Sequence, residues 1–224
     1  MIGIRLDSGD LAYLSVEARK LLDEGGFPNA KIVASNDLDE NIIVSLKDQG
    51  ARIDVWGVGT KLITAYDQPA LGGVYKLSAI REKNGEWKNK VKLSEQSLKV
   101  SNPGIQQVRR YQRNSEYLAD VIFDKKTDLK TGCVMIDPLD MTRQKRILEN
   151  TKFEDLLVPI FRKGKKVYAA PTLEETRKHL QEDLGHFHTG VKRFVNPHQY
   201  PVGLEKSLHA LKTELILHAR EVTV

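Results

Sequence analysis

Short apolar runs alternate with longer amphipathic stretches over residues 2–66. The apolar runs cover 2–6, 31–35 and 53–56, and each ends at a polar or glycine-containing turn. Between them, apolar residues recur every three or four positions over 11–22 and again over 42–46, which is the helical period. This alternation predicts β-α-β-α-β with a parallel sheet, whose strands end at one common edge.

The pattern changes after Gly72-Gly73, where β-like runs replace the alternation. Such runs cover 74–80, 106–111, 118–123 and 133–136, and Asn84-Gly85 is a hairpin turn signal. Two further runs, 156–161 and 166–168, flank Lys163-Gly164 as a second hairpin. Thr172 and Glu175 form a capping box for a helix over 173–184, and a last helix is predicted over 204–219. We therefore expect two parts, an α/β part over 1–80 and a β-rich part with C-terminal helices over 81–224.

Composition places the chain among globular proteins. Hydrophobic residues make up 40% and charged residues 29% of the 224 residues, which disfavours disordered, collagenous and coiled-coil proteins. No apolar run approaches the roughly 18 residues of a membrane span, and residues 1–5 lack the features of a signal peptide. The single cysteine, Cys133, excludes an intrachain disulfide and a thiolate zinc cage. We expect a cytoplasmic protein without a membrane partner.

The net charge of +5 and pI of about 9.1 raise nucleic acid as a partner. The excess lies over 81–130, where Lys88, Lys90 and Lys92 alternate with other residues next to Trp87. A solvated hairpin explains this pattern better than a track for a phosphate backbone, so we expect no nucleic-acid partner.

The glycine turn Gly57-Val58-Gly59-Thr60 follows the third predicted strand and opens a helix. Backbone N–H groups converge on an anion at such turns, the helix dipole favours negative charge, and Thr60 adds a hydroxyl. The lysine of a Walker A loop is missing. A tight strand-to-helix turn without a ligand is the alternative interpretation.

Charged residues also surround the exit of the first strand. Arg5 suits a carboxylate or phosphate, and Asp7 and Asp10 can accept hydrogen bonds from sugar hydroxyls or hold a metal ion through water. The alternative is structural: Asp7 or Ser8 caps the following helix, and Arg5 pairs with Asp7 or Asp54. Residues 36–37 occupy the corresponding exit of the second strand.

Other chemistry has little support in the sequence. All six histidines lie over 179–218, and His186 and His188 lack an evident third metal ligand. Cys133 lies in an apolar run and is interpreted as a buried structural thiol. The G-x-S-x-G motif of many hydrolases is absent.

Several motifs together resemble nicotinate phosphoribosyltransferase, over essentially the whole chain and in the same order. They are the segments 4–11 (IRLDSGDL), 33–40 (VASNDLDE), 55–62 (VWGVGTKL), 72–77 (GGVYKL), 156–161 (LLVPIF) and 196–202 (NPHQYPV). The chain resembles the C-terminal portion of that family.

The resemblance implies an enzyme of NAD salvage. The family joins nicotinate to 5-phosphoribosyl 1-diphosphate, which gives nicotinate mononucleotide and pyrophosphate. ATP hydrolysis is coupled through a phosphohistidine, with Mg²⁺. The implied fold is part of an irregular type II phosphoribosyltransferase α/β barrel with a β-rich and helical C-terminal appendage, and members usually act as cytoplasmic homodimers.

The resemblance also assigns roles to individual residues. Arg5 matches the arginine that contacts nicotinate, and Asp7 matches the catalytic carboxylate near the ribose and the pyridine ring. Ser8 shapes that turn and is expected, with Arg5 and Asp7, to bind nicotinate. A second set matches the loop that holds the 5-phosphate: Asn36, Gly57, Gly59 and Thr60.

One departure from the family bears on activity. The histidine that is phosphorylated lies upstream of the Arg5 strand in the family, and none of the six histidines here matches it. We therefore expect the isolated chain to be inactive. Two alternatives stay open: a related enzyme that takes nicotinamide or another pyridine, and a non-catalytic binding module.

Overall fold

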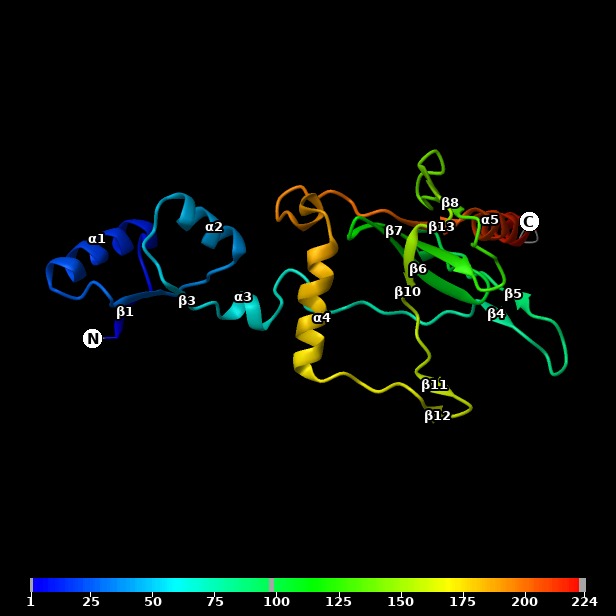
Figure 1. The fold of residues 1–224 in the computed structure, drawn as a ribbon, viewed down its shortest axis with the longest axis horizontal. Coiled ribbons are helices and arrows are strands. Elements are labelled where there is room, and N and C mark those ends of the chain that lie inside the picture. The colour runs from blue at the N-terminus through cyan, green and yellow to red at the C-terminus, as the bar shows by residue number, and fades with distance from the viewer. Residues whose placement is uncertain (1, 97–98, 222–224) are drawn as a thin grey trace. The chain divides into compact units, whose positions relative to one another are not determined.

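The computed structural model describes residues 2–96 and 99–221 (Figure 1). The chain divides into two compact units, residues 1–74 and 75–224, so the division lies before the boundary expected at residue 80. We call them the N-terminal unit and the C-terminal unit and describe each by itself.

The N-terminal unit is a parallel three-stranded sheet with helices between its strands. Its elements are β1 (Gly3–Leu6), α1 (Leu11–Glu24), β2 (Lys31–Ala34), α2 (Glu40–Asp48), β3 (Val55–Trp56) and α3 (Thr60–Ile63). The strands lie in the order β1-β2-β3, and both pairs are parallel. The predicted β-α-β-α-β arrangement is confirmed.

The two faces of this sheet differ sharply. Ile4, Leu6, Ile32 and Ala34 belong to one face and pack into the core with residues of α1 and α2. Because side chains alternate along a strand, Arg5 lies on the other face, in register with Val33 and Val55. Both α1 and α2 lie on the core side of the strands (Figure 1).

The C-terminal unit is built on a six-stranded sheet in the order β10-β6-β7-β13-β8-β9. The strands are β6 (Gln106–Arg113), β7 (Glu116–Asp124), β8 (Cys133–Ile136), β9 (Gln144–Ile147), β10 (Lys152–Asp155) and β13 (Val202–Glu205). All neighbours are antiparallel except β13 and β7, which are parallel. The sheet is therefore antiparallel except at β13, a strand that lies outside the β-like runs predicted from the sequence.

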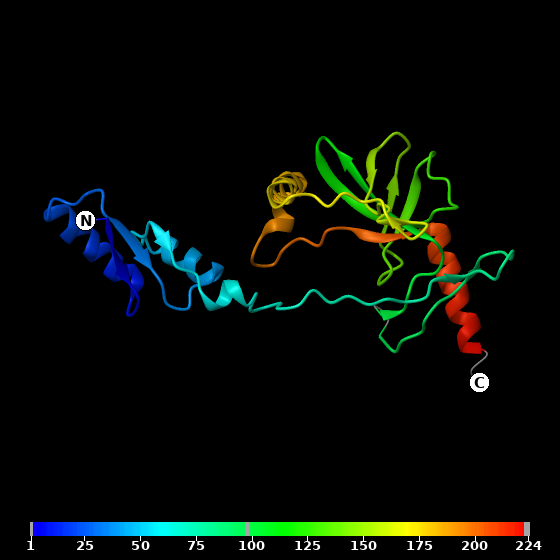
Figure 2. The ribbon, with the colours of Figure 1, turned by 90° about the horizontal axis from the view of Figure 1, so that it is seen from below.

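Two small hairpins and two helices complete this unit (Figure 2). The hairpins are β4 (Ala79–Ile80) with β5 (Lys88–Asn89), and β11 (Phe161–Arg162) with β12 (Lys165–Lys166). The strand predicted over 74–80 is thus confined to its last two residues. The helices are α4 (Leu173–His186), which begins at the predicted capping box, and α5 (Lys206–Glu221), and the short 3-10 helix η2 (Thr189–Lys192) lies between them. The helix predicted from residue 204 begins at Lys206 because Leu204 and Glu205 pair with β8.

A charged and aromatic cluster attaches the chain around α4 to the six-stranded sheet. The guanidinium of Arg110 donates from Nε and Nη2 to the two carboxylate oxygens of Asp120, each at 2.9 Å, and its Nη1 lies 3.3 Å from Asp183 of α4. Tyr117 donates to Asp183 at 2.5 Å and Tyr200 donates to Asp120 at 2.8 Å. The two carboxylates and Arg110 are largely buried, so the cluster is a stability element of the unit.

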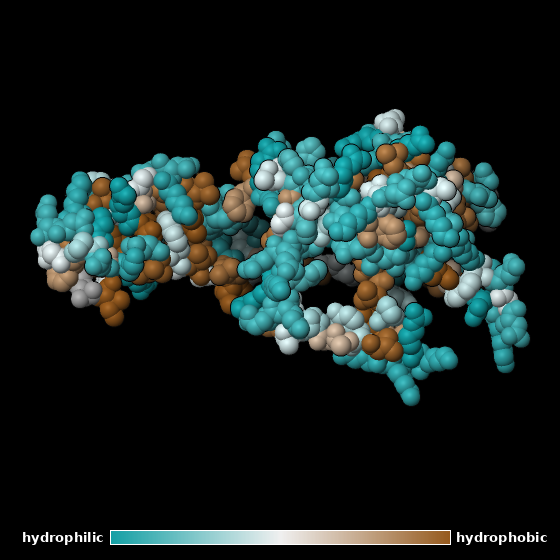
Figure 3. All heavy atoms as spheres, viewed as in Figure 1, coloured by the Kyte–Doolittle hydropathy of each residue, from teal (hydrophilic) through white to brown (hydrophobic). Residues whose placement is uncertain are grey.

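Apolar side chains reach the surface of both units among charged ones (Figure 3). Examples are Ile2, Leu62 and Ile63 in the N-terminal unit and Phe161 and Phe194 in the C-terminal unit. Among residues 2–96 and 99–221, no helix has both the length and the apolar character needed to cross a bilayer.

Candidate functional site

The three strand exits of the N-terminal unit meet at one edge of its sheet. The backbone N–H of Ser35, which follows β2, donates to the carbonyl of Leu6 at 3.0 Å. The N–H of Gly57, which follows β3, donates to the carbonyl of Ala34 at 2.7 Å. The prediction that these exits share one edge is therefore confirmed.

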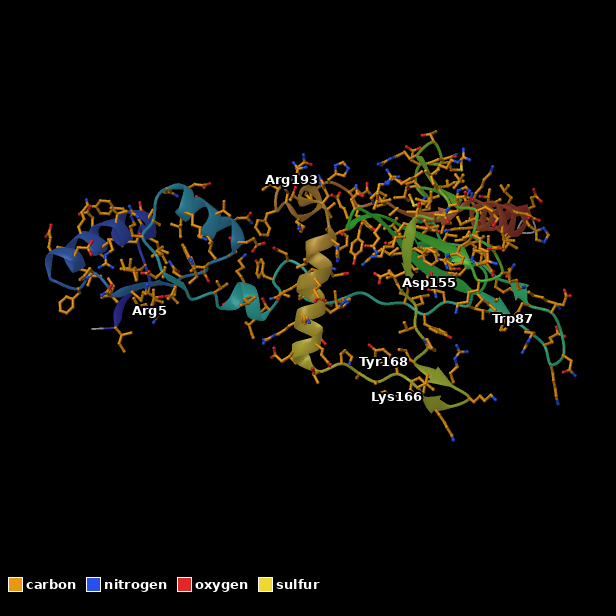
Figure 4. The ribbon with its side chains drawn as sticks, viewed as in Figure 1. Arg5, Trp87, Asp155, Lys166, Tyr168 and Arg193 are labelled. Atoms are coloured by element: carbon orange, nitrogen blue, oxygen red, sulfur yellow. The ribbon has the colours of Figure 1, made fainter. Side chains whose placement is uncertain are left out.

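Three side chains form a closed ring of contacts at this edge, which we call the Arg5 ring. Arg5 Nε donates to Ser35 Oγ at 2.9 Å, and the Ser35 hydroxyl donates to Asp7 Oδ1 at 2.5 Å. Arg5 Nη2 closes the ring with Asp7 Oδ1 at 2.8 Å. The Arg5 and Asp7 side chains remain 63% and 58% exposed, so the ring is open to a ligand. Figure 4 shows Arg5 on β1.

The environment of Asp7 keeps this carboxyl group ionised. The hydrogen bond from Ser35, followed by the hydrogen bond and charge of Arg5, holds the pKa of Asp7 below its ordinary value. Asp7 is thus an anion at neutral pH and acts as a hydrogen-bond acceptor or electrostatic partner rather than as a proton donor.

The structural alternative is confirmed for Arg5, which pairs with Asp7, but it is wrong about the helix cap and about Asp54. Asp10 caps α1 by accepting from the N–H of Tyr13 at 3.0 Å, so capping falls to Asp10 rather than to Asp7 or Ser8. Asp54 accepts from Lys31 and from the N–H of Ile32 and is not the partner of Arg5.

The turn after β1 depends on a glycine. Ser8 is exposed, and the following Gly9 has a φ of +78°, in the left-handed region that side chains disfavour. Ser8 lies in this turn, and no described residue forms a hydrogen bond with its hydroxyl, so its contact with nicotinate remains a prediction.

The glycine turn lies directly against Ser35. A Cβ atom on Gly57 would lie 3.3 Å from both the carbonyl oxygen of Ala34 and Cβ of Ser35, so only glycine fits there without displacing a neighbour. Gly59 is the N-cap residue of α3. The first N–H groups of a helix lack intrahelical partners, so the N–H groups of Thr60 and Lys61 are available to an anion.

Asn36 and Asp37 follow Ser35 with φ angles of 101° and 45°. Two consecutive non-glycine residues in the left-handed region form a strained turn, of the kind found at functional sites. Among the described residues, no hydrogen bond joins Asn36 to the glycine turn, so its predicted role toward the same phosphate remains a prediction.

The contacts of Ser35 with Arg5 and Asp7 were not predicted from the sequence, although the register of the two strands implies them. Arg5 pairs with Val33 in a parallel ladder, so Asp7 and Ser35 are the next residues that share the face of Arg5. Counting two residues along both strands would have placed these side chains next to each other.

The histidines and the cysteine show no catalytic arrangement. The ring of His186 contacts the carbonyl of Ser115 at 2.6 Å, and His188 accepts from the N–H of Gly190. Burial raises the pKa of the Cys133 thiol, so this cysteine is a poor nucleophile. Within residues 2–96 and 99–221, no three His, Cys, Asp or Glu side chains are grouped as a metal site.

Comparison with known proteins gives a consistent family. The nicotinate phosphoribosyltransferase C-terminal domain family matches residues 105–212, within the C-terminal unit. The nicotinate phosphoribosyltransferase of Bacillus subtilis is 45% identical over 219 residues, which are 96% of this chain and 44% of that protein. The Dictyostelium discoideum enzyme of the same name is 35% identical and matches 92% of this chain and 37% of its own length.

A solved structure agrees on the fold. The crystal structure of human nicotinic acid phosphoribosyltransferase superimposes with a TM-score of 0.69 at 24% identity and covers 96% of this chain and 40% of that chain. The chain thus spans less than half the length of these relatives. On these matches, residues 105–212 belong to the nicotinate phosphoribosyltransferase C-terminal domain family, and the chain as a whole is similar to the C-terminal part of nicotinate phosphoribosyltransferases.

Proposed function

We propose that the chain forms part of a nicotinate phosphoribosyltransferase of NAD salvage. This enzyme joins nicotinate to 5-phosphoribosyl 1-diphosphate and releases pyrophosphate. The observation that carries the proposal is the convergence of the Arg5 ring and the glycine turn at the carboxyl edge of a parallel sheet. Ligands of such sheets bind at this edge.

The three-stranded sheet is proposed to belong to an α/β barrel. Its uncovered face carries Arg5, Val33 and Val55, and side chains in these positions of a barrel point into the interior. The helices α1 and α2 would then form part of the outer layer. The family resemblance and the single covered face of the sheet support this arrangement.

Arg5 is the proposed partner of the nicotinate carboxylate. Its guanidinium presents five N–H donors. The Arg5 ring uses Nε and Nη2, and Nη1 forms no hydrogen bond or ion pair with any residue that the structure describes. The Nη1 side of the fork therefore remains for a carboxylate, which is the group that distinguishes nicotinate from uncharged pyridines.

Asp7 is the proposed catalytic carboxylate. When the bond from the anomeric carbon to pyrophosphate breaks, positive charge develops on the ribose ring. An ionised carboxylate beside the ring stabilises that charge more in the transition state than in the ground state, which is the condition for catalysis. The lowered pKa of Asp7 supports this role, since it keeps the group charged.

The glycine turn is the proposed site of the 5-phosphate. Gly57 and Gly59 allow a phosphate to approach the backbone, and Thr60 offers both an N–H and a hydroxyl at the start of α3. With the phosphate held by the exit of β3 and the carboxylate held by Arg5, the pyridine nitrogen and the anomeric carbon would be oriented toward each other. Asn36 is proposed to approach the same phosphate.

ATP and Mg²⁺ are proposed for the complete enzyme, as the family resemblance implies. The described residues contain no carboxylate cluster that would hold the metal ion, and none of the six histidines matches the histidine that the family phosphorylates. We therefore assign no step on this chain to them. A cytoplasmic homodimer without nucleic-acid or membrane partners completes the proposal, and the pairing of Lys88 with Glu82 in the β4–β5 hairpin agrees with a solvated hairpin.

The test uses a complete enzyme, in which this chain follows the upstream part of the Bacillus subtilis relative. With nicotinate, 5-phosphoribosyl 1-diphosphate, ATP and Mg²⁺, we expect nicotinate mononucleotide, and Asp7→Asn should lower kcat about 100-fold. The control is Asp39→Asn, because Asp39 caps α2 and asparagine caps equally well. The 224-residue chain alone should give no product. Absence of product from the complete enzyme, or equal losses in both variants, would refute the proposal.

A further inference from the structure

We propose that Ser35 is a positioning residue that holds Arg5 and Asp7 in a single relative geometry, with one edge of each group left free for substrate. This inference rests on the proposed function, because it assigns a role to Ser35 within that site. It adds to the site a residue to which the family resemblance assigned no role.

The hydroxyl of Ser35 acts both as a hydrogen-bond acceptor and as a hydrogen-bond donor within the Arg5 ring. It accepts a hydrogen bond from Arg5 Nε and donates one to Asp7 Oδ1. Because a guanidinium can only donate and a carboxylate can only accept, the hydroxyl proton of Ser35 must point toward Asp7. The ring thereby engages Nε and Nη2 of Arg5 and a single oxygen of Asp7. Within the described residues, the contacts of Asp7 involve Oδ1 alone, which leaves Oδ2 for the ribose or the pyridine ring.

An ion pair alone would not fix this geometry. The Arg5 and Asp7 side chains are mostly exposed, and exposed pairs contribute little because water and side-chain freedom compete with them. Two additional hydrogen bonds to one hydroxyl restrict the rotation of both side chains. Ser35 therefore fixes the orientation of the Arg5 and Asp7 side chains, which their ion pair alone would leave free to rotate.

The backbone keeps Ser35 in place between its neighbours. Its N–H is bonded to the carbonyl of Leu6, and the glycine turn contacts it from the other side at Gly57. The left-handed turn at Asn36 and Asp37 then carries the chain away from the ring. The position of the Ser35 hydroxyl is thus determined by β1, β2 and the exit of β3, and not by its own rotamer alone.

The decisive measurement is an NMR titration of side-chain carboxyl carbons in the 224-residue chain, in the wild type and in Ser35→Ala and Ser35→Thr. Arg5 is the charged group that contacts Asp7; the neighbouring Asp10 caps α1. Loss of the hydroxyl removes the largest cause that lowers the pKa of Asp7, so Ser35→Ala should raise that pKa. Ser35→Thr restores a hydroxyl and should return the pKa toward the wild-type value.

Asp54 is the internal control for folding. Its pKa is lowered by the N–H of Ile32 and by Lys31, contacts that depend on the same sheet but not on Ser35. A rise of the Asp7 pKa with an unchanged Asp54 pKa supports the positioning role. An unchanged Asp7 pKa in Ser35→Ala overturns it, and so does a rise of both, because Ser35 would then serve the fold as a whole.

Kinetics of the complete enzyme provide the second readout. We expect Ser35→Ala to lower kcat/KM for nicotinate roughly tenfold, to move its acid limb to higher pH, and to be rescued by Ser35→Thr. A loss without a shifted acid limb contradicts the proposal. Failure of the proposed function itself would appear differently, as absence of turnover in the wild type, while the titration of the 224-residue chain would still report on Ser35.

Discussion

Replacing Asp120 by asparagine tests the cluster that attaches the α4 region to the six-stranded sheet. Asp120 accepts two hydrogen bonds from Arg110 at 2.9 Å and one from Tyr200 at 2.8 Å. Asparagine has nearly the same volume, but it removes the charge and turns an NH₂ group toward donors. The guanidinium of Arg110, whose side chain is 15% exposed, would then lack its main counter-charge.

The magnitude follows from burial and from the remaining partner. Removing one member of a buried ion pair costs about 3 to 5 kcal/mol, because the other charge stays buried without compensation. Arg110 retains Asp183 at 3.3 Å, which is a longer contact. We therefore expect the lower end of that range, a loss of about 3 kcal/mol in the free energy of unfolding of the C-terminal unit.

Native-state hydrogen exchange of the β6 and β7 amides measures this change within one unit of the full chain. The matched control is Asp128→Asn, since Asp128 pairs with Lys130 at 4.0 Å and both side chains are highly exposed. That variant should lose less than about 0.5 kcal/mol. A loss below about 1 kcal/mol at Asp120, or equal losses in the two variants, would show that burial does not make the Arg110–Asp120 pair important for stability.

Two further predictions concern a helix end and a pH dependence. Thr172→Ala removes the hydroxyl that accepts from the N–H of Glu175 in the capping box of α4. The amides in the first turns of α4 should therefore lose about 1 kcal/mol of protection against hydrogen exchange. Unchanged protection would contradict the assignment of Thr172 as the helix cap. The Asp54 carboxylate, whose pKa is lowered by the N–H of Ile32 and by Lys31, stabilises the fold above its unfolded pKa of about 3.9, and this contribution disappears as the pH falls through the lower folded pKa. The urea midpoint of Asp54→Asn should therefore lie below that of the wild type at pH 7 and approach it in strong acid, whereas a constant difference would argue against the ion pair.

The periodic part of the chain was the most predictable from sequence. Alternating apolar runs and helical spacing over 2–66 determine the parallel sheet, and parallel strands end at one edge by geometry. The capping box at Thr172 located the start of α4, because this signal depends on local residues alone.

Long-range pairing accounts for the errors in the C-terminal unit. The strand β13 consists of only Val202–Glu205 and lies beside the start of α5, so its partners β7 and β8 are invisible to any local pattern. The strands β9 and β10 carry mostly polar residues and lack the apolar alternation that predicts a strand.

For the candidate site, the sequence indicated residue types but not the contacts between them. Arg5 and Asp7 were found by their place at a strand exit, whereas the role of Ser35 depends on the register between β1 and β2. A serine is also a common turn residue, so its type alone carries little information. The register, once known, places Ser35 beside Asp7.

The guanidinium of Arg5 is the proposed recognition group for the carboxylate of nicotinate. The most direct measurement is kcat/KM of the complete enzyme for nicotinate and for nicotinamide, in the wild type and in Arg5→Gln. We predict that the wild type prefers the acid and that the variant loses about 100-fold on nicotinate, the worth of a charge-assisted hydrogen-bonded pair. On nicotinamide it should lose only about tenfold, because there Arg5→Gln disturbs the Arg5 ring around Asp7 but removes no partner of a substrate carboxylate. Equal losses on both substrates, or a wild-type preference for the amide, would contradict the account.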